Sequence, residues 1–209
     1  MKLILVRHGE TWYNLEGRAI GQNPEGLNSR GRLQALRTAE ALAPLAPFAL
    51  YSSPLPRARE TANIICQRLG VGLCLRDNLQ EANIGLLDGL TSQEMRQQYP
   101  AFMRTWSQAA STAVMPGGES ILQVQERAWK TMEEIVALHP EGNVAVVSHN
   151  FTIQGLLCRF LGIPLAGFQR LRLDPASITL LEVRQGRTTL VRYNDRCHLE
   201  GLERDEEED

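Results

Sequence analysis

Short apolar runs divide this 209-residue chain into segments that predict buried β-strands. Residues 3–6 are four apolar residues in succession, and residues 143–148 repeat this pattern further along the chain. Runs this short, bounded by polar or Gly-containing segments, are typical of strands buried on both faces of a parallel sheet. Four further strands are predicted, the last two forming a terminal hairpin joined through residues 184–187, and they cover residues 48–53, 73–76, 178–183 and 188–193.

Apolar positions between these strands recur at helical spacing. Asn28 or Ser29 can cap the first predicted helix, which Pro44 ends. The apolar positions expected to share one face of that helix are Leu33, Leu36, Ala39 and Leu42. Caps and prolines predict that further helices begin near residues 56, 91, 100, 121 and 152. Residues 12–26, rich in Gly, Asn and Pro, have no clear period and predict a loop.

The composition favours one intracellular domain. A chain of 209 residues is too short for two ordinary enzyme domains, so we expect one domain over residues 1–196 and a disordered acidic tail over residues 197–209. A net charge of −2 gives no global reason to bind nucleic acid or an anionic membrane. The four cysteines lack metal-ligand spacing, and no apolar run approaches signal-peptide or transmembrane length. We therefore expect a soluble, cytoplasmic protein.

Histidines follow two of the predicted strands directly. Arg7 and His8 come after residues 3–6, and His149 comes after residues 143–148. Ligands of open α/β sheets bind just beyond the carboxyl ends of strands, so we expect these side chains at one site. A neutral imidazole is a competent nucleophile near pH 7. For His8 taken alone, the alternative is an incidental histidine satisfied by local hydrogen bonds.

The sequence Leu-Val-Arg-His-Gly-Glu-Thr at residues 5–11, followed by Asn14, resembles the signature of the histidine phosphatase (phosphoglycerate mutase-like, branch 1) superfamily. The resemblance implies an α/β fold, a three-layer α/β/α sandwich with a mostly parallel central sheet and a small helical cap. We expect residues 91–106 to form that cap. It also implies that His8 becomes a phosphohistidine, with Arg7 holding the phosphoryl group. Asn14 is either a phosphate contact or a turn-forming residue.

Three later segments extend the resemblance. Residues 52–62 resemble the second family motif, with the sequence Ser-Ser-Pro-Leu-Pro-Arg-Ala-Arg-Glu-Thr-Ala. This resemblance implies that Arg57 is a phosphate ligand and leaves Arg59 as a solvated residue or a substrate contact. Glu81 matches the acid that protonates the leaving oxygen. His149 matches the second catalytic histidine, which stabilises charge on the transferring phosphoryl group. His139 and His198 belong to no motif and receive no catalytic role.

The chain departs from the family pattern at three places. Ile20 stands before Gly21 where a polar residue is usual, and Gln22 can compensate, so Gly21 and Gln22 are carried as substrate-binding candidates. Leu87 and Asp88 replace a usual Trp and Glu, which removes an aromatic wall. Asn150, a further substrate-binding candidate, replaces the Gly that follows the second histidine in many relatives.

These residues predict a metal-independent phosphatase that hydrolyses a small-molecule phosphomonoester through a phosphohistidine. No metal site and no cofactor are expected, because the arginines supply the positive charge. The expected partner is a phosphorylated small molecule, without nucleic acid or membrane, and a homodimer is left open. The alternatives are a cofactor-dependent phosphoglycerate mutase, whose typical Tyr-Gly-x-Leu-x-Gly-Leu-Asn-Lys motif is missing from the sequence, and a non-catalytic module that binds a phosphorylated ligand.

Overall fold

The computed structural model of the chain describes residues 1–184 and 187–202. Within these residues, six strands form one sheet in the order β3-β2-β4-β1-β5-β6. The first four strands are parallel to one another, and β5 lies antiparallel to both β1 and β6. The strands are β1 (Lys2–Arg7), β2 (Ala49–Ser52), β3 (Leu73–Leu75), β4 (Asn143–Ser148), β5 (Ile178–Arg184) and β6 (Arg187–Asp195).

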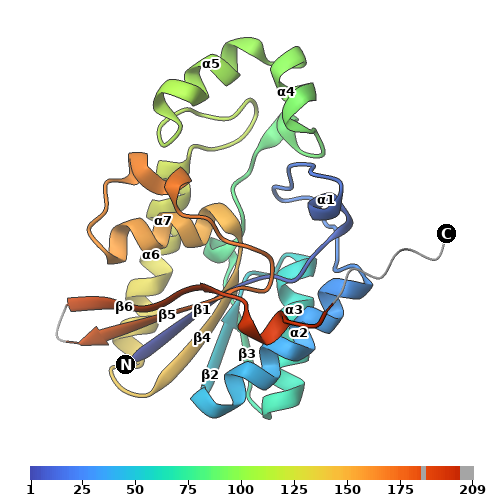
Figure 1. Cartoon of the computed structure of the whole chain (residues 1–209). Helices are drawn as coiled ribbons and strands as arrows, with labels where there is room; N and C mark the ends of the chain where they lie inside the picture. The colour runs from blue at the N-terminus through green and yellow to red at the C-terminus, as the bar shows by residue number, and fades with distance from the viewer. Residues whose placement is uncertain (185–186, 203–209) are drawn as a thin grey trace.

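Helices cover both faces of this sheet. Figure 1 shows α2 and α3 on one side and α6 and α7 on the other, with α4 and α5 set apart above the sheet. The α-helices are α1 (Trp12–Leu15), α2 (Ser29–Leu42), α3 (Pro56–Leu69), α4 (Ser92–Gln98), α5 (Pro100–Ala109), α6 (Ile121–Leu138) and α7 (Asn150–Phe160). Short 3-10 helices are η1 (Ala43–Leu45), η2 (Asp77–Leu79), η3 (Gly85–Leu87), η4 (Leu165–Arg170) and η5 (Cys197–Leu199). The three-layer α/β/α sandwich with a helical cap is confirmed.

Helices on both faces of the sheet explain why the two central strands, β1 and β4, have continuous apolar sequences. Side chains alternate between the faces of a strand, so a strand covered on both faces needs apolar residues at every position. In β1, Leu3 and Leu5 belong to the core shared with α6 and α7, whereas Ile4 and Val6 belong to the core shared with α2 and α3. The adjacent strand β4 alternates in the same way. This packing fixes the two strands whose ends carry the histidines.

The buried face of α2 differs from the expected one. Asn28 is the N-cap, and its side chain accepts a hydrogen bond from the Gly31 N–H. Leu33 and Leu36 are 45% and 46% exposed, so the prediction that they lie on the buried face is wrong. The buried face of α2 instead consists mainly of small or polar residues, which let the helix lie close to α3 and to the segment after β1. The buried residues of α2 are Gly31, Gln34, Ala35, Thr38, Ala39 and Leu42.

Two segments expected to be irregular contain local structure. Residues 12–26 begin with α1, because Thr11 and Asn14 form reciprocal hydrogen bonds that cap this single turn. Residues 197–202, assigned to the tail from sequence, begin with η5, which packs on α2 and buries Leu199. Residues 203–209 and the predicted hairpin residues 185–186 lie outside the described residues.

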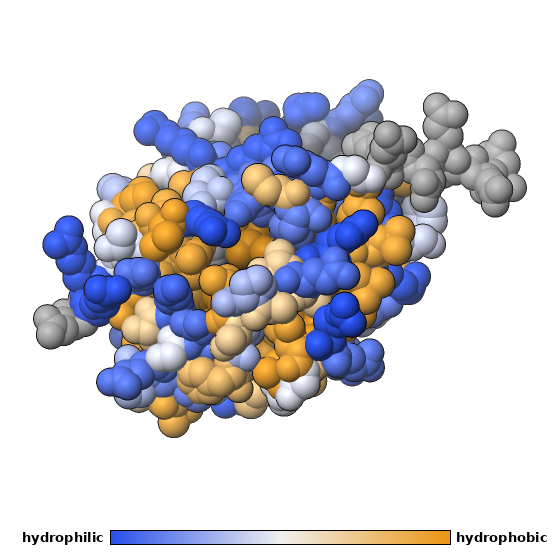
Figure 2. Space-filling view, turned by 60° about the horizontal axis from the view of Figure 1, so that its bottom comes forward, coloured by the Kyte–Doolittle hydropathy of each residue, from blue (hydrophilic) through white to orange (hydrophobic). Residues whose placement is uncertain are grey.

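The side of the molecule turned away from the cap is shown in Figure 2. Apolar residues appear there in several groups with polar residues between them. Among the described residues, every helix is too short or too polar to span a bilayer. The homodimer stays a prediction.

Candidate active site

The backbone at the end of β1 is held from three directions. The His8 N–H donates to the Ser148 carbonyl at 3.0 Å, and the His8 carbonyl accepts from the Ala176 N–H at 2.9 Å. Gly9 lies against the first turn of α2, where an added Cβ would come within 2.5 Å of the Gly31 carbonyl oxygen. Only glycine fits this close approach, which explains the glycine that follows His8.

A hydrogen bond to the backbone fixes the tautomer of His8. Its Nδ1 lies 2.7 Å from the Gly9 carbonyl oxygen, which can only accept, so the proton of the neutral ring resides on Nδ1. Burial, followed by the positive charges of Arg57 and Arg7, lowers the pKa of His8 well below its usual value. The ring is therefore neutral at pH 7, with an unprotonated Nε2.

His149 lies beside His8 because β4 pairs directly with β1. The two ring centroids are 5.2 Å apart. The Ser53 Oγ atom lies 2.7 Å from His149 Nε2 and also accepts from the Leu55 N–H at 3.2 Å. Among the described residues, Nε2 is the one acceptor recorded for the proton of the buried Ser53 hydroxyl, so the hydroxyl donates to Nε2 and the proton of the neutral ring lies on Nδ1. Burial and the charge of Arg57 lower the pKa of His149 well below its usual value.

Two arginines supply positive charge next to these rings. Arg57, in the first turn of α3, is fully buried and donates to the Gly21 carbonyl at 2.6 Å and the Asn23 carbonyl at 3.1 Å. Burial lowers the pKa of Arg57 to about 10, so it remains charged at pH 7. Arg7 donates to the Leu173 carbonyl at 2.6 Å.

Three buried N–H donors of this cluster remain unused. Within the part of the chain that the structure describes, Arg7 Nε, Arg57 Nε and His149 Nδ1 have no hydrogen-bond partner. Buried polar groups in folded proteins are normally paired, and an unpaired one is costly. Donors gathered around an uncharged imidazole suit an anion with several acceptor oxygens, such as a phosphoryl group.

Glu81 is held at the start of α7, next to His149. Its carboxylate accepts from the backbone N–H of Ala82 at 2.9 Å, Phe151 at 3.1 Å and Thr152 at 3.3 Å. The Thr152 hydroxyl lies 3.4 Å from the same carboxylate and donates its proton to the Gln80 carbonyl at 2.8 Å. Two of the first N–H groups of α7 are thereby capped by a residue 70 positions away, which ties Glu81 to the helix that begins next to His149.

Arg127 on α6 is a site residue that sequence analysis missed. Its guanidinium donates to the carbonyls of Asn78, Gln80 and Glu81 at 2.7 to 2.9 Å. The same group pairs with Glu119 at 2.8 Å. Arg127 therefore fixes the segment that carries Glu81. A single arginine on an amphipathic helix gives no sequence signal for this role, because a solvated side chain has the same pattern.

Asp88 holds the loop that faces Arg57. Its two carboxylate oxygens each accept a backbone N–H at 3.2 Å, one from Gly21 and one from Asn23. The carbonyls of these same two residues accept from Arg57. Asp88, which stands where the family usually has Glu, thus holds the loop that Arg57 contacts.

Of the four substrate-binding candidates, two contact Arg57 or Glu81 and two make hydrogen bonds elsewhere. Gly21 contacts Arg57 through its carbonyl, and Gln22 donates to the Glu81 carbonyl at 3.2 Å. Asn14 uses its side-chain oxygen in the cap of α1, and Asn150 donates to the Gln154 side chain at 3.4 Å. Their contacts with substrate remain predictions. The histidines without a motif are engaged elsewhere, His139 with Tyr51 and His198 with Thr38.

The described residues contain no group of three or more His, Cys, Asp or Glu side chains arranged to hold a metal ion. The positive charge that the structure gathers beside His8 comes from Arg7 and Arg57, whose charges both act on its pKa. An anion bound there would contact guanidinium and imidazole groups directly.

The two buried histidines predict that stability falls in mild acid. Both have a folded-state pKa well below 6.5, whereas in the unfolded chain each takes up a proton below about pH 6.5. The unfolded state therefore binds more protons as pH falls through this range. The free energy of unfolding should decrease by up to about 1.4 kcal/mol per pH unit for each histidine. Urea denaturation between pH 7.5 and pH 5 measures this slope.

The control for this slope is the double variant His8→Asn with His149→Asn. Carboxylates titrate in both proteins, so only the difference between them reports on the histidines. That difference should change with pH below about 6.5. A constant difference across the range would show that neither histidine is held neutral by the fold.

Comparisons with known proteins identify the family of this chain. The family model described as "Histidine phosphatase superfamily (branch 1)" matches residues 3–196. Phosphoserine phosphatase 1 of Hydrogenobacter thermophilus is 32% identical over 199 residues, covering 95% of this chain and 94% of that protein. The probable phosphoglycerate mutase GpmB of Escherichia fergusonii is 31% identical over 185 residues, or 88% and 86% of the two chains.

A solved structure gives the same result for the fold. The mycobacterial glucosyl-3-phosphoglycerate phosphatase in complex with VO3 superposes with a TM-score of 0.86 at 31% identity, covering 93% of this chain and 99% of that one. Family model, sequence relatives and superposition all extend over nearly the whole length. This chain belongs to branch 1 of the histidine phosphatase superfamily.

Proposed function

We propose that this protein is a phosphatase that hydrolyses phosphomonoesters of small molecules through a phosphohistidine on His8. The observation that carries the proposal is a set of N–H donors on Arg7, Arg57 and His149, unpaired among the described residues, around a neutral imidazole. Two of the compared relatives are named as phosphatases of small phosphorylated molecules, which supports hydrolysis. The residue roles below are part of the proposal.

In the first half-reaction, the phosphoryl oxygens bind Arg7, Arg57 and His149, which neutralise the charge of the transferring group. The His8 Nε2 lone pair attacks phosphorus in line with the leaving oxygen. The new N–P bond forms as the P–O bond to the alcohol breaks. Glu81 gives its proton to that oxygen, so a neutral alcohol leaves.

In the second half-reaction, a water molecule replaces the alcohol. Glu81, now a carboxylate, takes a proton from the water as the water oxygen attacks phosphorus. The N–P bond breaks, inorganic phosphate is formed, and His8 returns to the neutral form that its Gly9 hydrogen bond favours. The protein is then ready for another cycle.

Product analysis distinguishes hydrolysis from the mutase alternative, which needs a test because one relative, GpmB, is named as a probable phosphoglycerate mutase. Purified protein is incubated with a panel of phosphoesters, and with 3-phosphoglycerate in the presence and absence of 2,3-bisphosphoglycerate. We expect inorganic phosphate from several esters. Conversion of 3-phosphoglycerate to 2-phosphoglycerate that depends on the bisphosphate, with little phosphate release, would establish a mutase instead.

Ser53 is predicted to act through His149. The substitution Ser53→Ala removes the hydroxyl that directs the His149 proton to Nδ1, and loss of one such hydrogen bond should lower kcat/KM about 5- to 10-fold. The matched control is Ser177→Ala, since Ser177 is also buried and its hydroxyl has no partner among the described residues. Rates measured across pH should show a changed profile for the Ser53 variant only. Equal losses of kcat/KM in both variants would mean that Ser53 contributes only to packing.

A further inference from the structure

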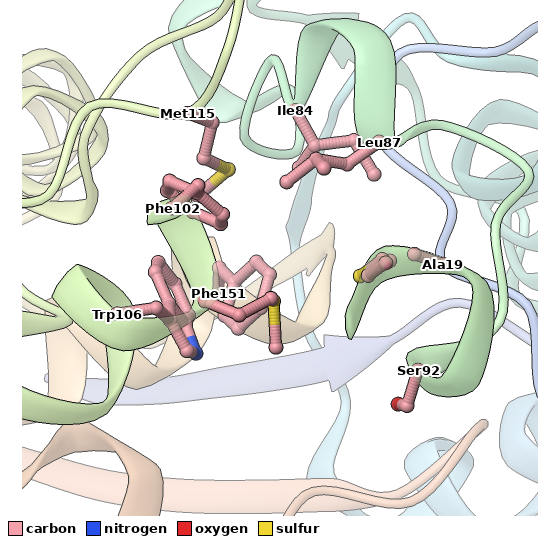
Figure 3. A pocket seen from close by; sticks show the side chains of 10 residues that line it. Ala19, Ile84, Leu87, Ser92, Phe102, Trp106, Met115 and Phe151 are labelled. Carbon is pink, nitrogen blue, oxygen red and sulfur yellow. The ribbon is translucent and has the colours of Figure 1, made fainter. Parts of the chain in front are cut away.

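An apolar cavity of about 230 Å³ lies between the cap and the start of α7. Figure 3 shows side chains from the cap, from the segment around η3 and from α7 directed into this space. Its walls include Leu87, Met95, Phe102, Met103, Trp106 and Phe151. In the described part of the chain, no charged side chain lines the cavity, and the polar side-chain atoms on its wall come from Ser92 and Trp106.

The cavity adjoins the catalytic cluster at two points. Phe151 donates its backbone N–H to the Glu81 carboxylate at 3.1 Å, while its ring lines the cavity. Gly21 accepts from Arg57 at 2.6 Å, and a Cβ on Gly21 would come within 2.7 Å of Ile84 Cγ1, another part of the cavity wall. Phe151 therefore touches both the cavity and Glu81, and Gly21 lies between Arg57 and the Ile84 part of the cavity wall.

This position identifies which part of a substrate the cavity can receive. Arg7, Arg57 and His149 surround the phosphoryl group, whereas Glu81 must reach the oxygen that bridges phosphorus and the alcohol. The rest of the alcohol continues beyond that oxygen on the Glu81 side. Because the ring of Phe151 lies on this side, the alcohol extends into the apolar cavity.

We propose that the cavity binds the leaving alcohol, and that the preferred substrates are phosphomonoesters of apolar aliphatic or aromatic alcohols. This inference rests on the proposed phosphatase function. An engineered apolar cavity of about 150 Å³ is large enough to bind benzene, so the larger volume here accommodates one aromatic ring or a short alkyl chain. A carboxylate or ammonium group on the alcohol would lose its hydration there without gaining a charged partner.

The cavity wall suits a class of alcohols rather than one compound. Trp106 packs edge-on against Phe151 at 6.0 Å and against the fully buried Phe168 at 6.1 Å, so this wall is rigid. Met95 on α4 and Met103 on α5 have flexible side chains that can adapt to different shapes. Alcohols of different length and branching can therefore be accepted.

A series of n-alkyl phosphates tests this proposal, because their leaving oxygens are chemically alike. kcat/KM should rise by about fourfold per methylene from ethyl to hexyl phosphate until the cavity is filled. The same chains ending in a carboxylate, and phosphoserine, should remain at or below ethyl phosphate. Rates that do not change with chain length, or that are higher for the carboxylate-ended esters, overturn the proposal.

A matched pair of variants locates the effect. Met103→Gln places an amide on the cavity wall and should flatten the dependence on chain length, whereas Arg104→Gln changes the exposed neighbour and should leave the series unaltered. A Met103→Gln series that keeps the full dependence on chain length overturns the assignment of this cavity. Thermal unfolding of both variants establishes that they are folded.

Calorimetry separates a failure of this inference from a failure of the proposed function. Hexylphosphonate and 5-carboxypentylphosphonate cannot be hydrolysed, and the wild-type protein should bind the first more tightly, by 10-fold or more. Apolar preference in binding without hydrolysis of any ester would overturn the phosphatase and retain the cavity as a ligand site. Hydrolysis of esters without apolar preference would overturn the cavity assignment and leave the phosphatase in place.

Discussion

Replacing His8 by asparagine should lower kcat for phosphate release by at least about 1,000-fold, because the variant has no nucleophile to accept the phosphoryl group. Asparagine preserves a donor that can reach the Gly9 carbonyl, which His8 Nδ1 contacts at 2.7 Å. It cannot form a covalent phosphoramidate through an imidazole nitrogen. The loss should therefore appear in kcat, while Arg7 and Arg57 still bind phosphate.

Rapid quenching of the wild-type reaction should trap phosphate on the protein in a form that is stable in base and labile in acid. His139→Asn is the matched control, since His139 lies at the end of α6, where it contacts Tyr51 and not the site, and should keep nearly full activity. Acid-labile phosphate on the His8→Asn protein would assign the nucleophile to another residue. Phosphate binding by wild-type protein with neither turnover nor adduct would indicate a non-catalytic binding module.

Glu81→Gln should lower kcat/KM by about 100- to 10,000-fold for alkyl phosphates, whose alcohols need a proton in order to leave. The N–H groups of Phe151 and Thr152 donate to different oxygens of the carboxylate, so the single amide oxygen of glutamine retains one of these two contacts with α7. The amide has no acidic proton to transfer. For p-nitrophenyl phosphate, which releases a stable phenolate, the loss should be much smaller.

The difference between the two esters is what distinguishes proton donation from positioning. Glu126→Gln is the control, because Glu126 is an exposed carboxylate next to Arg127 on α6 and should leave both esters unaffected. Equal losses for alkyl and aryl esters in Glu81→Gln would mean that Glu81 holds α7 in place without acting as the acid. A change confined to KM would point to substrate binding alone.

Local sequence patterns were sufficient for most elements. The continuous apolar run of β1 predicts a strand that is covered on both faces, as it is in the structure. The helices capped by Asn28, Thr91 and Ser120 begin close to the predicted starts near residues 28–29, 91 and 121. The same patterns failed for α2. Two leucines there, Leu33 and Leu36, face outward, while Gln34 and Thr38 are buried because each makes a hydrogen bond inside the protein. Apolar spacing alone does not reveal such a hydrogen bond.

The sequence by itself determined which residues are the candidates for chemistry. Arg7, His8 and His149 stand at strand ends in recognisable motifs, and a strand end is a local property that apolar periodicity and chain direction specify. Glu81 and Arg57 were added by resemblance. None of this required knowing which strands are neighbours.

Only the tertiary structure decided how these residues meet. Pairing of β1 with β4 brings the two imidazoles within 5.2 Å, and contacts across tens of residues give Glu81 its place through Arg127 and give His149 its orientation through Ser53. The apolar cavity likewise forms from separate segments. The physical reason is that hydrophobic periodicity and capping act between residues close in the sequence, so they specify each helix or strand separately. Long-range contacts depend instead on the order of the strands and on how the layers pack, and no single segment encodes either of these.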